Sequence, residues 1–190
     1  MTTFILHGGE TTRDNSSNEA FFKCFTRFAE GSTVNILMCY FSKERETWGE
    51  RLEADKNRIV RHTDKEVTLS LASDPEDLMI KLETHDVLYV AGGDAELIEP
   101  LLSRMKELGE RLEGKVYLGC SMGAFIVSSQ YVLSFDNQPS SKVHKGLGLL
   151  PFSTLCHWDV EEEKDFKIKL LKEYSSQSPV VSGSKSPVSG

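Results

Sequence analysis

Two nearly continuous apolar runs, Val87–Ala91 and Val116–Leu118, constrain the fold of this chain most. A strand with one face in water alternates apolar and polar residues, whereas a strand covered on both faces does not. Such runs are typical of the central strands of a parallel sheet, and parallel strands need long crossover connections, usually helices. We therefore expect the rest of the chain to supply helices for both faces of one sheet.

Strand-like and helix-like segments alternate along the chain, as that architecture requires. Strand patterns occupy residues 2–9, 33–41, 66–72, 86–93 and 115–120. Helical patterns occupy residues 18–29, 42–62, 74–84 and 95–114, and residues 122–130 are compatible with a helix. Ser42 is a plausible N-cap of the second helix, and Pro100 lies in the first turns of the fourth, where proline costs least. The pattern predicts an α/β fold with a doubly wound, mostly parallel sheet and helices on both faces.

Length and charge limit the classes of protein to be considered. The 190 residues are enough for one self-sufficient core, so we expect a single domain over 1–174 and a Ser/Pro/Gly-rich tail over 175–190. The "SPVVSG" stretch of that tail is compatible with an edge strand. A net charge of −7 supplies no basic field for nucleic acid or an anionic membrane. No window approaches the roughly 18 apolar residues of a membrane-spanning helix, and the first residues lack a basic signal-peptide region, so we expect a cytoplasmic protein.

The cysteines and histidines give no sign of a metal or a disulfide framework. Four cysteines include no C-x-x-C pair, and five histidines include no H-x-x-x-H or H-E-x-x-H spacing. We therefore predict no metal and no cofactor.

Small and reactive residues gather where the predicted strands end. They lie at His7–Gly9, Cys39–Tyr40, Gly92–Asp94 and Gly119–Ala124. Ligands of doubly wound sheets bind beyond the carboxyl ends of the strands. These four loops are therefore expected to share one edge of the sheet and to form the site.

The last of these loops contains a G-x-S-x-G motif, Gly119–Gly123, centred on Ser121. A predicted strand precedes it and a helix-compatible segment follows, which is the context that the motif requires. The glycines fit a tight turn in which a Cβ atom would collide with neighbouring backbone, and the turn aims the Met122 amide toward a developing oxyanion. Cys120 is expected to face away from that opening. The alternative is that small residues merely allow the helix to pack closely on the sheet.

Three stretches in order resemble the peptidase E family of serine peptidases, which comprises aspartyl dipeptidases and has the cyanophycinases as relatives. The first is "DVLYVAGGDAELIEPLL", which is similar to a strand, Gly-Gly-Asn turn and helix of the family. The second, "YLGCSMGAF", resembles its G-x-S-A-G-A turn, and the third, "GLGLLPFSTLCHWD", resembles the segment leading to its catalytic histidine. The resemblance covers most of the chain and implies a flavodoxin-like or class I glutamine amidotransferase-like fold.

The resemblance also implies roles for individual residues. Ser121 would be the nucleophile and His157 the general base, while the amides of Gly93 and Met122 would form the oxyanion hole next to Gly92. These roles suit the chemistry, because a serine hydroxyl needs an adjacent base and imidazole supplies one near neutral pH. Taken alone, His157 would be read as a packed histidine at the end of a strand.

The sequence departs from the family pattern at Asp94, which stands where the family usually has asparagine. A carboxylate at this place would repel an acidic side chain of a substrate, so neutral or basic residues are expected to be preferred. The alternative is that the Asp94 side chain caps the helix beginning at Ala95 and faces away from the pocket.

The second departure concerns the carboxylate that orients the histidine. The family supplies it from a late strand and loop, but this chain has no Asp or Glu after Glu173. Asp159 is the substitute we predict, with the run Glu161–Glu163 as the other candidate. Without an orienting acid the enzyme would act as a dyad, which retains part of its catalysis. The charged face of Lys43–Arg58 is assigned to solvent and Trp48 to a packing contact.

The sequence therefore favours a serine-type peptidase that hydrolyses short peptides, as a dipeptidase does, through an acyl-enzyme on Ser121. A small peptide is the expected partner, and a homodimer is compatible with the sequence. One alternative is a catalytically weak or inactive homologue that binds a small peptide or metabolite in the same cleft. Amidotransferase-like chemistry is a further alternative, but it needs cysteine at the centre of the turn, and Cys120 comes one position too early.

Overall fold

A computed structural model gives the fold, and it describes residues 1–133, 142–156, 161–174 and 180–182. Five strands form a wholly parallel sheet in the order β1-β5-β4-β2-β3. They are β1 (Thr3–His7), β2 (Thr33–Cys39), β3 (Glu66–Leu71), β4 (Val87–Val90) and β5 (Val116–Cys120). Every residue of β4 and β5 is buried, which confirms that the two apolar runs are central strands.

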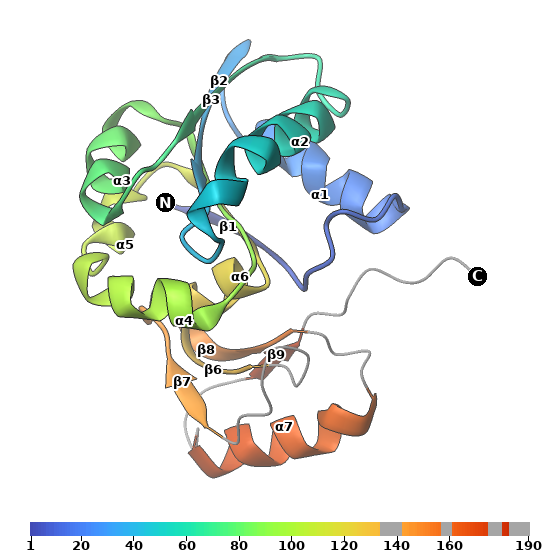
Figure 1. Ribbon diagram of the computed structural model, residues 1–190, viewed down its shortest axis with the longest axis vertical. Coiled ribbons are helices and arrows are strands. Elements are labelled where there is room, and N and C mark those ends of the chain that lie inside the picture. The colour runs from blue at the N-terminus through green and yellow to red at the C-terminus, as the bar shows by residue number, and fades with distance from the viewer. Residues whose placement is uncertain (134–141, 157–160, 175–179, 183–190) are drawn as a thin grey trace.

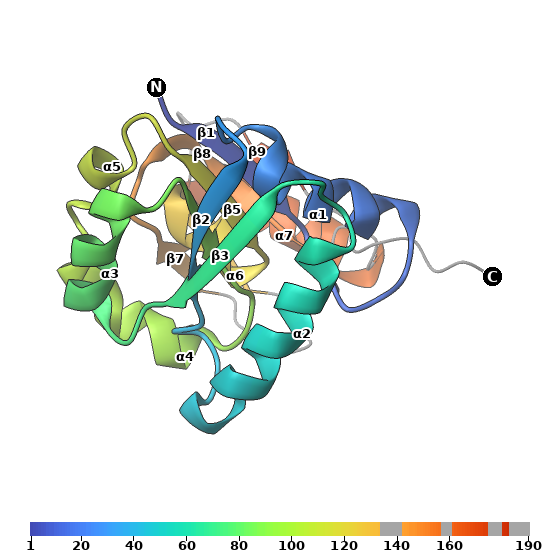
Figure 2. The same ribbon diagram turned by 90° about the horizontal axis from the view of Figure 1, so that it is seen from above.

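Helices cover both faces of this sheet, as Figures 1 and 2 show. Helices α1 (Ser16–Arg27) and α2 (Trp48–Val60) lie on one side, and α3 (Pro75–Lys81) lies on the other. Phe25 of α1 packs its ring 5.0 Å from the ring of Tyr89 in β4. The doubly wound α/β fold is thus confirmed. No helix within the described residues is long and apolar enough to cross a bilayer.

A second sheet of four strands lies beyond helix α6 (Met122–Val127) and was not predicted as a separate layer. Its order is β7-β6-β8-β9, formed by β6 (Ser128–Val132), β7 (Val143–Lys145), β8 (Leu150–Leu155) and β9 (Val180–Ser182). Helix α7 (Glu161–Tyr174) lies on the outer side of this sheet (Figure 1). All six residues of α6 are buried, since it lies between the two sheets.

Helix α6 ends earlier than the sequence suggests, because Ser128 turns the chain into β6. The Ser128 hydroxyl donates to the carbonyl of Phe125 at 2.6 Å, which satisfies an acceptor at the end of the helix.

The single helix expected over residues 95–114 is wrong. The structure has α4 (Ala95–Ile98), a 3₁₀ helix η3 (Glu99–Arg104) and α5 (Leu108–Arg111). Pro100 lies at the start of η3. Its ring excludes the backbone hydrogen bond and crowds the carbonyl four residues earlier, so the α-helix cannot continue through it.

The helix expected from Ser42 also begins later than predicted. Ser42 does not cap it, because the Ser42 hydroxyl donates to the carbonyl of Ala91 at 2.9 Å. A 3₁₀ turn, η1 (Arg45–Thr47), precedes α2, and another, η2 (Leu82–Thr84), follows α3. The segment that follows β2 is thereby fixed to the loop that follows β4.

Candidate active site

Ser121 occupies a strained turn between β5 and α6. Its backbone angles are φ 48° and ψ −105°, in a region that residues with a side chain rarely adopt. The Ser121 amide donates to the carbonyl of His7 at 2.9 Å, and its own carbonyl accepts from the amide of Phe125 at 3.0 Å. Strain of this kind costs about 1–3 kcal/mol and persists only where the surroundings enforce it. Here a strand on one side and a buried helix on the other enforce it.

The two glycines of the motif are required by close backbone approaches. A Cβ atom on Gly119 would lie 2.5 Å from the carbonyl oxygen of Gly123. On Gly123, a Cβ atom would lie 2.1 Å from the carbonyl oxygen of Val90. The prediction that a Cβ atom at either glycine would collide with neighbouring backbone is therefore confirmed.

The Gly92–Gly93 turn lies directly against Ser121. A Cβ atom on Gly92 would be 2.8 Å from the Cβ atom of Ser121, and on Gly93 it would be 1.9 Å from the carbonyl oxygen of Ser42. The amide of Asp94 donates to that same carbonyl at 2.8 Å. The turn is thus held between Ser121 and the segment after β2.

Two backbone amides beside Ser121 have no acceptor among the described residues. Within the part of the chain that the structure describes, neither the Gly93 amide nor the Met122 amide donates a hydrogen bond. Met122 begins α6, where the first amides of a helix are free of intrahelical partners. Both amides are available to a bound oxygen.

A cavity of about 320 Å³ opens next to Ser121. Its wall comes from the loop after β1 (residues 9–12), from Lys43 and Arg51, from Tyr89 and residues 91–93, and from Cys120 with Ser121. Three of the four loops predicted to share one edge of the sheet therefore contribute to it. The fourth, Cys39–Tyr40, is buried, and Lys43 takes its place a few residues further on.

Cys120 is buried, but it contributes to the wall of the Ser121 cavity, so the expectation that it faces away from that opening is wrong. Burial raises the pKa of the Cys120 thiol to about 11, although a hydrogen bond with Thr11 partly offsets the rise. The thiol is therefore neutral at physiological pH, whereas a cysteine nucleophile must be a thiolate.

The segment assigned to solvent, Lys43–Arg58, turns out to have an inward face, so that assignment is wrong. Asp55 is only 1% exposed, and its carboxylate accepts from the Tyr40 hydroxyl at 2.9 Å. Arg51 lies one helical turn before Asp55 and lines the cavity. Burial, and then the neighbouring Arg51, lower the pKa of Lys43. Trp48 is a packed residue, as predicted, and Ile59 is also buried, but Arg51 and Asp55 between them are polar and carry no apolar signal of this face.

Asp94 occupies the N-cap position of α4, but its side chain makes no capping hydrogen bond. The capping alternative is therefore wrong in this structure. The charge of Asp94 instead acts on Lys43, whose pKa it raises, against the larger effects of burial and Arg51. The predicted repulsion between Asp94 and an acidic substrate is therefore opposed by the attraction of Lys43 and Arg51, which line the cavity.

His157 and Asp159 lie outside the described residues, and so do the side chains of Glu161–Glu163. Cys156, the residue immediately before His157, is described. Its Sγ atom lies 3.9 Å from the carbonyl oxygen of Ser121. The end of β8 therefore reaches the Ser121 turn.

His7 supports the Ser121 turn, because its carbonyl accepts from the Ser121 amide. Its Nδ1 atom accepts from the amide of Gly9 at 3.2 Å, and burial lowers its pKa, which favours the neutral ring. It does not line the cavity. Within the described ranges, no group of three or more His, Cys, Asp or Glu side chains could hold a metal ion.

A glycine-flanked serine at positive φ, on the carboxyl edge of a doubly wound sheet, places the chain among α/β proteins with a strand–serine–helix turn. Residues 4–183 match the profile of peptidase family S51, so the chain belongs to that family.

The relatives found are also peptidases. The chain is 28% identical to the uncharacterized peptidase Lmo0363 of Listeria monocytogenes serovar 1/2a, over 82% of each sequence. Among solved structures it is similar to a candidate peptidase E protein from Listeria monocytogenes EGD-e. That match has a TM-score of 0.61 and 21% identity, and it covers 97% of this chain and 91% of the other. A peptidase from an acI-B1 Actinobacterium matches with a TM-score of 0.60 and 19% identity, over 88% and 74%. These two likenesses show the shared fold.

Proposed function

We propose that this protein is a serine-type peptidase that hydrolyses short peptides through an acyl-enzyme on Ser121. The observation that carries the proposal is the strained backbone of Ser121 at the wall of a cavity, with the Gly92–Gly93 turn against it. Membership of family S51 supports the assignment of peptidase activity, and the strained turn supports Ser121 as the attacking residue.

The reaction would proceed in two halves. The Ser121 oxygen attacks the peptide carbonyl while its proton passes to His157, and the resulting oxyanion accepts hydrogen bonds from the Gly93 and Met122 amides. The C–N bond then breaks, and the amine leaves with the proton from His157. A water molecule, deprotonated by the same base, releases the acid from Ser121.

Two observations support these roles. The Gly93 and Met122 amides have no acceptor within the described part of the chain, as donors to an oxyanion require. The contact between Cys156 and the Ser121 carbonyl places the residue before His157 at the turn. Asp159 remains the acid that we propose to orient His157.

The cavity also suits short substrates. Its volume of about 320 Å³ is at the small end of the range for ligand pockets, about 300–1,000 Å³. A dipeptide or the end of a short peptide fits such a space better than a long chain does.

A fluorophosphonate probe tests the proposal, because it reacts with activated serines. The expected result is a single adduct on Ser121, mapped by mass spectrometry, which is lost in Ser121→Ala and retained in Cys120→Ala. Hydrolysis of short peptides should follow the same pattern. The absence of an adduct from the unaltered protein, together with intact peptide binding, would instead support an inactive homologue that only binds its ligand.

A further inference from the structure

Two cations line the Ser121 cavity without an ion-pair partner among the described residues. Lys43 and Arg51 both contribute to its wall. Neither side chain makes a hydrogen bond or an ion pair with any described residue, and the Nε atom of Arg51 is buried without an acceptor. Both residues are partly buried, and buried polar atoms of folded proteins are nearly always paired, so the unpaired Nε atom of Arg51 beside a second cation needs an explanation.

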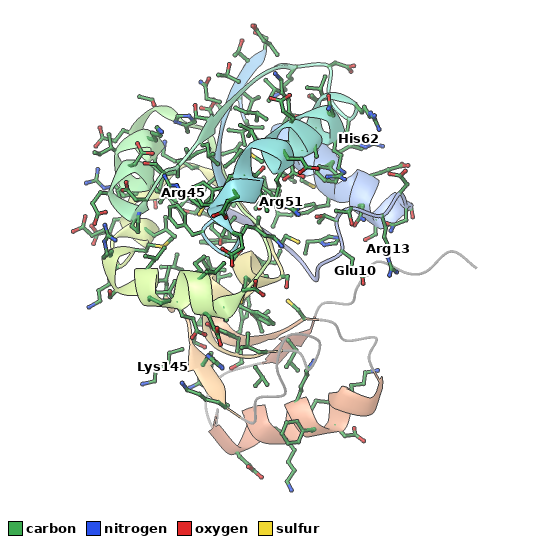
Figure 3. All side chains as sticks on the ribbon, viewed as in Figure 1. Glu10, Arg13, Arg45, Arg51, His62 and Lys145 are labelled. Carbon is green, nitrogen blue, oxygen red and sulfur yellow. The ribbon has the colours of Figure 1, made fainter. Side chains whose placement is uncertain are left out.

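The backbone that carries both cations is held in place by the fold. The Lys43 amide donates to the carbonyl of Tyr40 at 2.8 Å, and the Lys43 carbonyl accepts from the indole of Trp48 at 3.0 Å. Arg51 belongs to α2, which the buried Asp55 anchors to the sheet through Tyr40. Figure 3 shows Arg51 on the side of α2 toward the loop that carries Glu10 and Arg13.

None of the nearby carboxylates of the described residues forms an ion pair with Lys43 or Arg51. Asp55 accepts from Tyr40 through Oδ2 and from Arg58 through Oδ1, at 2.9 and 3.1 Å. Glu10 lines the cavity, but it is paired with Arg13 at 3.0 Å. Asp94 forms no ion pair with Lys43 and does not line the cavity. The positive charge of this wall is therefore not neutralised by contacts within the described protein.

Two like charges side by side in a partly desolvated cavity are unfavourable. The lowered pKa of Lys43 reflects this, since burial and the charge of Arg51 outweigh the charges of Asp94 and Asp55, which act in the opposite direction. The rest of the protein carries an excess of acidic residues, with a net charge of −7. An anion placed between the two cations would relieve the unfavourable interaction.

We infer that Lys43 and Arg51 form a subsite that binds a carboxylate of the substrate next to Ser121. The guanidinium of arginine can bind a carboxylate through two parallel hydrogen bonds, and the ammonium of lysine acts as a point charge. This inference rests on the proposed function in taking the ligand to be a short peptide. Such a peptide offers two carboxylates, the one at its C-terminus and that of an acidic side chain.

Binding to the Ser121→Ala protein tests the subsite without any turnover. Four peptides separate the two sources: Asn-Ala amide has no carboxylate, Asn-Ala has only the terminal one, Asp-Ala amide has only the side-chain one, and Asp-Ala has both. Calorimetry with Arg51→Gln and Lys43→Gln should show about 10- to 100-fold weaker binding of a peptide that carries the recognised carboxylate. Binding of Asn-Ala amide should change little.

Matched controls come from exposed lysines of α1 and α2. Lys23→Gln and Lys56→Gln each remove one positive charge from an exposed position, and neither residue lines the cavity. Both should leave the binding of all four peptides unchanged. Arg51→Lys should retain part of the affinity, and circular dichroism shows whether each variant is folded.

The four peptides distinguish the two sources of the carboxylate. A loss confined to Asn-Ala and Asp-Ala assigns the subsite to the C-terminal carboxylate, and a loss confined to the two Asp peptides assigns it to the acidic side chain. Equal losses for all four peptides, equal losses in the control variants, or binding that never depends on a carboxylate would overturn the inference. Since binding is measured without Ser121, a failure of the proposed hydrolysis leaves this result intact.

Discussion

The two walls of the Ser121 cavity are built on different principles. The wall formed by Gly92, Gly93 and the Ser121 turn is made of backbone, and its shape depends on missing side chains. The other wall is the part of the lining that presents the side chains of Lys43 and Arg51, and its character depends on charge. A backbone wall offers amides in fixed positions, whereas a side-chain wall selects its ligand. The comparison suggests that the first wall serves the reaction and the second serves recognition.

The largest effect is expected from Ser121 itself, at the centre of the backbone wall. Both Ser121→Ala and Ser121→Gly should lower kcat by about 10³-fold or more, because the nucleophile is lost. The glycine variant should be more stable than the alanine variant by about 1 kcal/mol, since glycine adopts φ 48° without strain. Peptide hydrolysis and urea unfolding measure the two quantities. Equal stability would show that the turn is not strained.

Substitution of Gly123 should damage the backbone wall without touching the charged one. Gly123→Ala is expected to lower the free energy of unfolding by about 2–4 kcal/mol, because its Cβ atom would lie 2.1 Å from the Val90 carbonyl oxygen. Gly49→Ala is the matched control, since a Cβ atom there meets nothing within 4 Å and Gly49 lies in α2. It should stabilise the protein by up to about 1 kcal/mol. Urea denaturation compares the two variants.

The buried thiol of Cys120, at the base of the cavity, should make stability depend on alkaline pH. Its pKa is about 11 in the folded protein, against 9.0 for an ordinary cysteine. The contribution of the neutral thiol to the free energy of unfolding is therefore complete below pH 9 and is lost as pH rises through 11. Between pH 8 and pH 10 this one group should remove about 1 kcal/mol from the free energy of unfolding. Urea unfolding at both pH values should show a smaller difference for Cys120→Ala. An unchanged difference would contradict the assignment.

The smallest effect is expected from Asp94, which follows the Gly92–Gly93 turn and does not line the cavity. Its charge offsets part of the positive charge of Lys43. Asp94→Asn should therefore strengthen binding of a carboxylate peptide by a factor of about 2–5, because the interaction is partly screened by solvent. The four peptides described above provide the measurement. Weaker binding of the Asp peptides in this variant would mean that Asp94 contacts the ligand directly.

The backbone wall was predictable from sequence and the charged wall was not. Gly119, Ser121 and Gly123 have fixed spacing and a strand–helix context, so geometry follows from residue type alone. Lys43 and Arg51 read as ordinary charged residues of a long helix, and only the fold turns them inward. The break at Pro100 was missed for a related reason, since the cost of proline depends on where the helix actually begins.

The central sheet followed from its apolar runs, because burial on both faces leaves a signal in each strand. The second sheet gave no comparable signal. Its strands are short, and β9 comes from residues 180–182, far along the chain from β6. Pairing over such distances depends on partners that no local pattern identifies.

Ser42 fastens the two walls of the cavity to each other. Its hydroxyl donates to Ala91 and its carbonyl accepts from Asp94, while the next residue in the chain is Lys43. Through Ser42, the backbone that carries Lys43 is tied to the Gly92–Gly93 turn. The distance between the residue that attracts a ligand and the amide that faces Ser121 is therefore set by the folded backbone before any substrate arrives.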